Sequence, residues 1–322
     1  MSIIEDISRP FWLLGLNQVS GPQTKGIGGV ICDEAYQLYS QITPTSFVLT
    51  FTDPGDFLGG FAGDINRIGS ASFESVLGIA RSTVLPRSTA WLVIQTYYAA
   101  FFSAHALLRM LGESCTPIER EQMNSLMRVG SLFGALPISP MAGGLYHIIC
   151  DPHAKTLSGT SLSGSPHEVF WRVFYDRMLR LSTDVLSVPT ESLANRQRAS
   201  GKLSELASNL CFQSAPTGRW LSTIRNAVNY SQKFATWHPY SGQHKYYDKL
   251  FEKTSEWSED PLDLDLTSYT DKDLRRFQVT CNFIIAAFRS LTQDMAERCT
   301  VGRSFHSFGA LACLNLANRA IR

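Results

Sequence analysis

The sequence predicts a mainly α fold: a helical bundle with a mixed, irregular N-terminal extension and extra C-terminal helices. Three observations predict it. Glycine and proline interrupt residues 1–86 at short intervals, apolar residues recur at helical spacing from residue 87 onward, and no motif repeats with a fixed period. The chain has 322 residues, of which 44% are hydrophobic and 18% charged, so it has enough apolar surface to bury a substantial core.

The N-terminal extension, residues 1–86, is expected to hold only short elements. Residues 33–41 are compatible with a short helix, and residues 46–51 with a strand, because β-branched and aromatic residues are enriched there. A helix is predicted over residues 71–80, ending before Pro86. The glycines around Gly28 lack a following Gly-Lys-Ser/Thr, so they indicate a plain loop and not a phosphate-binding one.

The segment 87–235 is expected to form the bundle. Residues 134–166 are predicted to be a long loop because proline, glycine and serine are frequent in them. Aromatic residues on one face of the helix predicted over 166–186 are expected to lie in the core and not to stack on bases. These are Phe170, Trp171, Phe174 and Tyr175. Helices are predicted over 88–111, 117–133, 166–186, 191–212 and 216–230.

The first bundle helix has the length of a membrane span. No formal charge lies between Arg87 and Arg109, and such a stretch is long enough to cross a bilayer. Polar residues such as Gln95, Ser103 and His105 interrupt it, and a bilayer penalises unpaired polar groups. A core helix is therefore favoured, and no membrane partner is expected.

The last segment, residues 236–322, is expected to be a helical extension that packs on the bundle. Helices are predicted over 271–299, where apolar residues recur, and over 303–321. The chain is thus divided into an N-terminal extension (1–86), a bundle (87–235) and a C-terminal extension (236–322).

Charge is distributed unevenly, although the formal net charge is only +1. Residues 171–233 contain nine Lys or Arg and four acidic residues, whereas residues 248–273 contain nine acidic residues and three lysines. Two interpretations stay open: two solvated faces that attract each other, or a polyanion site in the basic segment. The near-neutral total excludes a general attraction to nucleic acids or membranes.

The cysteines and the N-terminus favour a cytoplasmic protein. The seven cysteines include no C-x-x-C pair, which indicates reduced thiols, and the acidic N-terminus does not resemble a secretory signal. His147, Cys150 and His153 are spaced like metal ligands, but a structural zinc site needs four ligands. We therefore expect no metal and no cofactor.

Two motifs resemble those of a known family. The run from Tyr97 to Leu108, followed by Gly112, is similar to the long helix of HEPN domains (higher eukaryotes and prokaryotes nucleotide-binding). HEPN domains also carry a second motif, an Arg often followed by Asn, with a His four to six residues later. Arg225 and Asn226 resemble the first two residues of this second motif. The residues that match the first motif are Tyr97, Tyr98, Ala99, Phe101, Ala104, Ala106, Leu107 and Leu108.

The resemblance, which covers about residues 87–235, implies a HEPN-like bundle that acts on RNA. Active members are metal-independent endoribonucleases in which Arg holds the phosphate and His transfers protons. It also implies a homodimer, or a protein partner in a toxin–antitoxin or antiviral defence system.

The sequence departs from the second motif at its histidine. Where the family has His, this chain has Tyr230, and the next histidine is His238. Because the pKa of tyrosine is near 10, Tyr230 is a poor base at neutral pH, and His238 is the alternative proton acceptor. The expected catalytic residues are therefore Arg225, Tyr230 and His238, and the expected RNA-binding residues are Asn226, Asn229, Arg219 and Lys233.

Three functions stay open at this point. The leading hypothesis is an RNA-directed HEPN-like protein, and the alternative is a catalytically inactive scaffold or regulatory subunit of a larger assembly. A pocket for a small molecule inside the bundle is the third. Arg225 itself has a structural alternative, as a partner in an interhelical ion pair or as a cation in the last turn of its helix.

Overall fold

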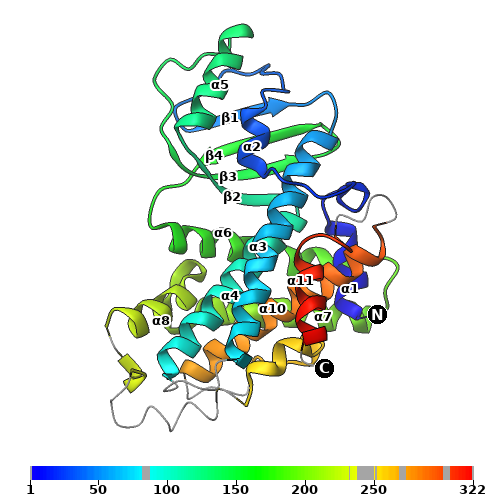
Figure 1. Cartoon of the computed structure of the whole chain (residues 1–322), viewed down its shortest axis with the longest axis vertical. Helices are drawn as coiled ribbons and strands as arrows, with labels where there is room; N and C mark the ends of the chain where they lie inside the picture. Colours follow the sequence, from blue (N-terminus) through cyan, green and yellow to red (C-terminus); the bar gives the residue numbers. More distant parts are fainter. Residues whose placement is uncertain are drawn as a thin grey trace.

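The computed structural model describes residues 2–81, 88–231, 233–237, 250, 252–267, 273–299 and 305–320. The fold is mainly α, and it also contains a four-stranded antiparallel sheet. Figure 1 shows the sheet at one end of the long axis and most helices at the other, with α3 (Gly55–Arg81) running between them. The other long helices are α4 (Thr89–Met110), α6 (Pro166–Asp184), α7 (Leu193–Leu210) and α10 (Asp273–Glu297).

The remaining elements are shorter. They are the α-helices α1 (Ile3–Ser8), α2 (Ile27–Cys32), α5 (Arg120–Leu132), α8 (Trp220–Asn229) and α11 (Ala310–Ala320), and the strands β1 (Ser46–Thr50), β2 (Glu113–Ile118), β3 (Gly144–Asp151) and β4 (Thr156–Ser161). Single 3₁₀ turns lie at Arg9–Phe11, Leu16–Gln18, Val185–Ser187, Phe212–Ser214, Pro216–Gly218, Lys233–Ala235, Thr254–Ser258 and Pro261–Asp263.

The sheet has the strand order β1-β4-β3-β2 and joins distant parts of the chain. Ser46 of β1 pairs with Thr160 of β4, and Cys115 of β2 pairs with His147 of β3. One face is buried by alternate side chains such as Phe47, Tyr146 and Leu157, as the two-residue period of a strand requires. The strand predicted at 46–51 is thereby confirmed.

The long loop predicted over residues 134–166 is wrong, because this segment contains the β3–β4 hairpin. The alternating burial of these residues is typical of strands. Most of the prolines and glycines of the segment lie before and after the hairpin and mark its limits. The turn is closed by Asp151, whose Oδ1 accepts from the backbone N–H groups of His153 (2.9 Å) and Ala154 (3.0 Å). Such Asx turns compete locally with helix formation.

The helix predicted over 117–133 begins later, at Arg120. Thr116 and Pro117 belong to β2, an edge strand where a proline without an N–H is tolerated. The N-cap is Glu119, whose capping box uses Gln122. The helices predicted from 216 and from 303 likewise begin later, at Trp220 and Ala310.

The N-terminal extension is more helical than predicted. The helix expected over 71–80 is the second half of α3, which begins at Gly55, and residues 33–41 are not helical. Glycines that looked like turn residues let α3 lie close to its neighbours. A Cβ on Gly63 would lie 2.1 Å from the Lys25 carbonyl oxygen, and one on Gly69 would lie 2.4 Å from the Phe288 ring.

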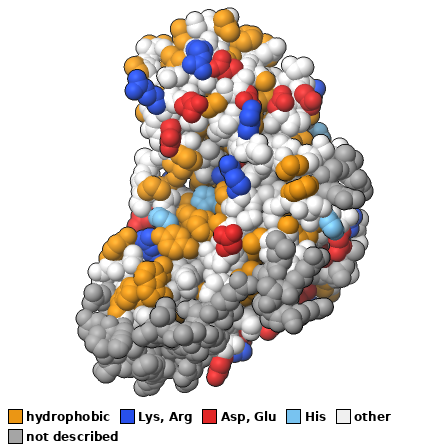
Figure 2. Space-filling view, in the orientation of Figure 1, with side chains coloured by type: hydrophobic (Ala, Val, Ile, Leu, Met, Phe, Trp, Pro, Cys, Tyr) orange, Lys and Arg blue, Asp and Glu red, His pale blue; other side chains and the backbone are white. Residues whose placement is uncertain are grey.

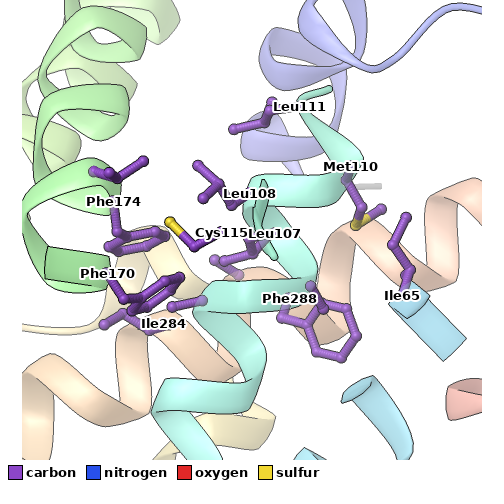
Figure 3. Close-up of a cluster of buried hydrophobic side chains, with 14 of the residues drawn as sticks. Ile65, Leu107, Leu108, Met110, Leu111, Cys115, Phe170, Phe174, Ile284 and Phe288 are labelled. Atoms are coloured by element: carbon purple, nitrogen blue, oxygen red, sulfur yellow. The ribbon is translucent and has the colours of Figure 1, made fainter. Parts of the chain in front are cut away.

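The core forms around α4, which is buried along most of its length. Figure 3 shows Phe170 and Phe174 of α6 and Ile284 and Phe288 of α10 gathered around its C-terminal half. The core helix predicted at 88–111 is therefore confirmed. Phe170, Trp171 and Phe174 are fully buried, so this part of the α6 stripe is core as predicted. All three sequence segments contribute to the same hydrophobic cluster.

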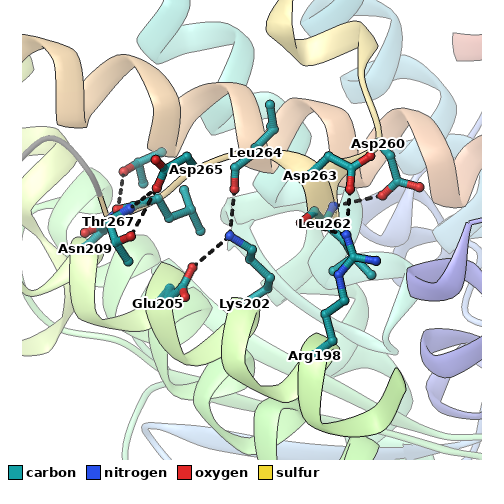
Figure 4. A network of polar contacts seen from close by, with 12 residues as sticks. Arg198, Lys202, Glu205, Asn209, Asp260, Leu262, Asp263, Leu264, Asp265 and Thr267 are labelled. Carbon is teal, nitrogen blue, oxygen red and sulfur yellow. Dashed lines mark hydrogen bonds and ion pairs between the residues drawn. The ribbon is translucent and has the colours of Figure 1, made fainter. Parts of the chain in front are cut away.

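The basic and the acidic segment are in contact. Figure 4 shows the acidic stretch that begins at Asp260 lying along α7. Arg198 of α7 donates to Asp263 (2.6 Å), and the ammonium group of Lys202 donates to the Leu264 carbonyl oxygen (2.8 Å). Part of the charge asymmetry is thus neutralised inside the molecule, as the first of the two interpretations expects.

Candidate functional site

The candidate site is built on α8, a short amphipathic helix. Its buried residues Leu221, Ile224 and Val228 lie one helical turn apart, and the helix packs against α4. This orientation leaves Arg225 half-buried at the edge of the interface, facing the aromatic residues of α4.

The Arg225 guanidinium lies among three tyrosines. One terminal nitrogen, Nη2, donates to the Tyr98 hydroxyl, and the other, Nη1, donates to Asn226 Oδ1 (2.9 Å) and to the Tyr230 hydroxyl (3.5 Å). The centre of the guanidinium is 5.4 Å from the ring centres of Tyr98 and Tyr230 and 5.8 Å from that of Tyr97. These distances are typical of cation–π contacts, which hold the cation without neutralising it.

No carboxylate among the described residues forms an ion pair with Arg225. Arg225 Nε is buried and has no hydrogen-bond partner in the described part of the chain. Two other arginines of the basic segment are paired with carboxylates: Arg219 lies 3.5 Å from Glu168, and Arg180 lies 2.7 Å from Glu113. Arg225 therefore keeps a positive charge that an anionic ligand can use.

The surroundings of Arg225 also keep it protonated. Burial lowers its pKa, but the hydrogen bond to Tyr98 and the nearby phenol oxygens of Tyr230 and Tyr97 raise it, so that the net pKa lies above the ordinary value. The guanidinium is a fixed cation at every working pH.

A histidine from another helix completes the cluster. His167 lies in the first turn of α6, and its Nδ1 is 2.9 Å from the Tyr97 hydroxyl. The indole N–H of Trp171 also donates to this hydroxyl, at 3.0 Å. Because tryptophan can only donate, the Tyr97 oxygen accepts from it, and the Tyr97 proton is available to His167 Nδ1. We assign the proton of the neutral imidazole to Nε2 on this basis, which makes Nε2 a hydrogen-bond donor.

The environment keeps His167 neutral. Burial lowers its pKa below the ordinary value, and the charge of Arg225 lowers it further. The first turn of α6 adds a positive helix end beside it, and Ser165 at the N-cap makes no side-chain cap bond there. The site therefore combines a fixed cation, a neutral N–H donor and a helix N-terminus, all of which attract an anion.

The structure brings together some of the predicted site residues. Asn226 and Tyr230 contact Arg225 directly. Arg219 lies at the opposite end of α8 and is paired with Glu168. Asn229 is half-buried at the end of α8, and Lys233 is exposed in the turn that follows. His238 lies outside the described residues.

Sequence analysis missed His167 and the roles of Tyr97 and Tyr98. The two tyrosines were visible only as members of the long-helix motif. His167 follows Pro166 at a helix start, and no local signal relates it to Arg225, because the two meet only when α6 and α8 both pack on α4. A search for histidines in first helical turns would have included it.

Other candidate sites are weaker. A cavity of about 890 Å³ near Trp12 is lined by Arg9 and Arg298, but both guanidinium groups bind Asp294. The cavity inside the bundle between α4, α6, α7 and α10 is about 20 Å³, with room for one water molecule at most.

No metal site is found in the part of the chain that the structure describes. His147 and Cys150 lie on opposite faces of β3, and His147 bonds to Glu113 (2.9 Å). All seven cysteines lie among the described residues, and none of them forms a disulfide. Among the described residues, no helix combines the length and the apolar character that crossing a membrane requires.

We compared the chain with protein-family models, with curated proteins and with solved structures. None of the three comparisons finds a match. The resemblance to HEPN domains accordingly rests on the two sequence motifs alone.

Proposed function

We propose that this protein is an RNA-directed protein with a HEPN-like bundle, and that it binds a phosphate group of RNA at Arg225. The observation that carries the proposal is the positive charge of Arg225, which no described carboxylate neutralises. A guanidinium is well suited to phosphate because its planar fork of donors matches two phosphate oxygens.

The neighbouring groups support a phosphate ligand. The hydroxyl of Tyr230 and the amide of Asn226 offer further donors next to the guanidinium, and His167 adds a ring N–H from the far side of the tyrosine pair. Tyr230 is 70% exposed, so it can reorient toward a ligand without breaking the core. A phosphate bound here would replace solvent around a cation that is already held in position.

The hydrogen bonds favour binding over cleavage. Attack by a ribose 2′-hydroxyl needs a group that accepts its proton, and His167 already accepts the Tyr97 proton on Nδ1 and carries a proton on Nε2. This favours the second candidate, an inactive HEPN-like scaffold or regulatory subunit that recognises RNA. A role as a toxin or antiphage defence component is part of the same proposal, on the resemblance alone.

The test measures RNA affinity for two arginine variants of the same helix. Arg225→Gln is expected to weaken binding of a fluorescently labelled RNA at least tenfold, because it removes a charge-assisted contact. The control Arg219→Gln is expected to weaken it less than threefold, because Glu168 already neutralises Arg219. Anisotropy titrations at two salt concentrations measure both. Equal losses in the two variants would contradict the proposal.

A second assay separates binding from cleavage. The protein is incubated with RNA in the presence of a metal chelator, and 2′,3′-cyclic phosphate ends are sought. Under the binding interpretation, wild type makes no such ends while Arg225-dependent affinity persists. Cuts that are lost in both Arg225→Gln and His167→Gln would instead establish a metal-independent ribonuclease.

A further inference from the structure

One face of α4 carries aromatic rings that the fold leaves partly exposed. They are Trp91, which is 56% exposed, and the half-buried Tyr98, Phe101, Phe102 and His105. At 100° per residue these five positions fall within about one quarter of the helix circumference. We refer to them as the α4 strip. Most other residues of α4 are buried in the core.

Four rings of the α4 strip, those of Tyr98, Phe101, Phe102 and His105, form a continuous chain of contacts, while Trp91 lies about two helical turns away from them. Ring centres are 6.0 Å apart for Tyr98 and Phe102, 6.1 Å for Phe101 and Phe102, and 4.6 Å for Phe101 and His105. Trp237 extends the strip at the Trp91 end, 5.5 Å from Trp91. Figure 2 shows hydrophobic side chains gathered over α4, α6 and α8, with histidines and a cation beside them.

The strip has polar groups at its edge that a purely apolar interface would leave unsatisfied. Arg225 contacts Tyr98, which lies midway along the length of the strip. The His167 ring centre is 4.6 Å from that of Phe101. His105 accepts from Arg109 Nη1 on its Nδ1 (3.2 Å), so its proton also lies on Nε2. Two imidazole N–H donors and one guanidinium therefore border the rings.

We propose that the α4 strip stacks the unpaired bases of single-stranded RNA, whose phosphate is bound by Arg225; this rests on the function proposed above. Aromatic rings beside a cation fit such a strand, because every base offers a π-face and every nucleotide a negative charge. A duplex does not fit, because its bases are already stacked on one another. The uncompensated charge of Arg225 favours this occupant over an apolar protein surface.

The dimensions match a short oligonucleotide. Trp91 and His105 are 14 residues apart on one helix, which is about 21 Å along its axis. At the stacking rise of about 3.4 Å per nucleotide this corresponds to about six nucleotides, and to fewer if the strand is extended. Arg225 contacts the strip near its middle, so the bound phosphate would have bases on both sides.

The experiment compares three probes of one length: a labelled single-stranded RNA decamer, the same decamer in a duplex, and a base-free decamer of the same backbone. Wild type is expected to bind the single strand at least tenfold more tightly than either of the others. Equal affinity for the duplex or for the base-free strand would overturn the inference.

Matched variants assign the effect to the strip. Phe102→Leu keeps an apolar side chain of similar size but removes the ring, and it is expected to weaken single-strand binding about tenfold, the effect of one lost stacked base. Phe133→Ala is the control, because this ring is 44% exposed at the end of α5, outside the strip. Trp91→Ala provides a second variant at the opposite end, should Phe102→Leu lower the melting temperature.

The outcomes separate this inference from the proposed function. If Arg225→Gln weakens binding while Phe102→Leu and Trp91→Ala do not, phosphate binding stands and base stacking is refuted. If no RNA probe binds wild type, both are refuted. If Trp91→Ala changes the sedimentation coefficient and leaves RNA affinity unchanged, the strip is an interface between two copies of this chain, which also refutes the inference.

Discussion

Arg225 and His167 stand 58 residues apart in the sequence, yet both contact the same pair of tyrosines. Tyr98 holds the guanidinium and Tyr97 orients the imidazole, so two adjacent residues of one helix position both polar groups. The prediction of Arg225, Asn226 and Tyr230 as neighbours came from a motif on one helix. His167 could not be predicted in the same way, because its position depends on the packing of α6 on α4.

Glu113 is the residue whose loss should destabilise the protein most directly. Its carboxylate accepts from His147 (2.9 Å) and Arg180 (2.7 Å), and Arg177 lies 3.2 Å away. Burial raises the pKa of Glu113. The His147 hydrogen bond and the charges of the two arginines lower it by more than burial raises it, so the net pKa lies below the ordinary value.

We therefore expect Glu113→Gln to lower the free energy of unfolding by about 3 kcal/mol, because it removes the nearer anion of the buried Arg177 and leaves only Asp184, 3.7 Å away. Urea denaturation followed by circular dichroism measures the change. The control Asp263→Asn breaks the exposed pair with Arg198 and should change stability by less than about 1 kcal/mol. Similar effects of the two substitutions would mean that Glu113 is not structurally important.

The two histidines beside Phe101 make stability depend on pH. Burial lowers the pKa of His105 well below its ordinary value, and the charges of Arg109 and His167 lower it further. Unfolded histidines bind protons below about pH 6.5, whereas these two stay neutral in the folded state to lower pH. The unfolded state therefore binds more protons as the pH falls, and stability falls with it.

The expected loss is up to about 1.4 kcal/mol per pH unit for each histidine, below pH 6.5. His105→Phe keeps the stacking on Phe170 and should reduce this slope between pH 6.5 and 5. Denaturation curves at several pH values measure it. An unchanged slope in His105→Phe would disprove the assignment.

Among the elements, the long helices were the most predictable. The helices expected at 88–111, 166–186 and 191–212 match α4, α6 and α7 to within about two residues at each end, because their caps and apolar periodicity are local properties. The β3–β4 hairpin and the first half of α3 were missed. Both depend on contacts with distant residues: β4 on its pairing with β1, and α3 on close approach to α2 and α10.

Two glycines of α3 test whether this helix depends on close packing against its neighbours. A Cβ on Gly69 would lie 2.4 Å from Phe288 and 2.9 Å from Ala310, whereas one on Gly78 would meet nothing within 4 Å. Gly69→Ala is expected to destabilise the protein by about 1–3 kcal/mol through overpacking. Gly78→Ala should stabilise it by about 0.5–1 kcal/mol, because alanine favours the helix. Thermal denaturation compares them, and effects of the same sign would be the contrary result.

At the scale of the whole molecule, the near-neutral net charge and the charged site are compatible. Asp263 of the acidic stretch pairs with Arg198 of α7, and Glu113 and Glu168 pair with arginines of α6 and at the start of α8. The total charge does not show which cation lacks a carboxylate partner, since this depends on the contacts of each side chain. Arg225 is such a cation because its neighbours are aromatic.

The pairing of β1 with β4 has a consequence for how the protein is made. During synthesis, Ser46 leaves the ribosome more than a hundred residues before its partner Thr160. At about 5–20 residues per second, the Ser-Phe-Val-Leu-Thr strand waits several seconds with an open edge, which is a template for wrong pairing between nascent chains. The cell must therefore shield this stretch, or translate it quickly, until the hairpin emerges.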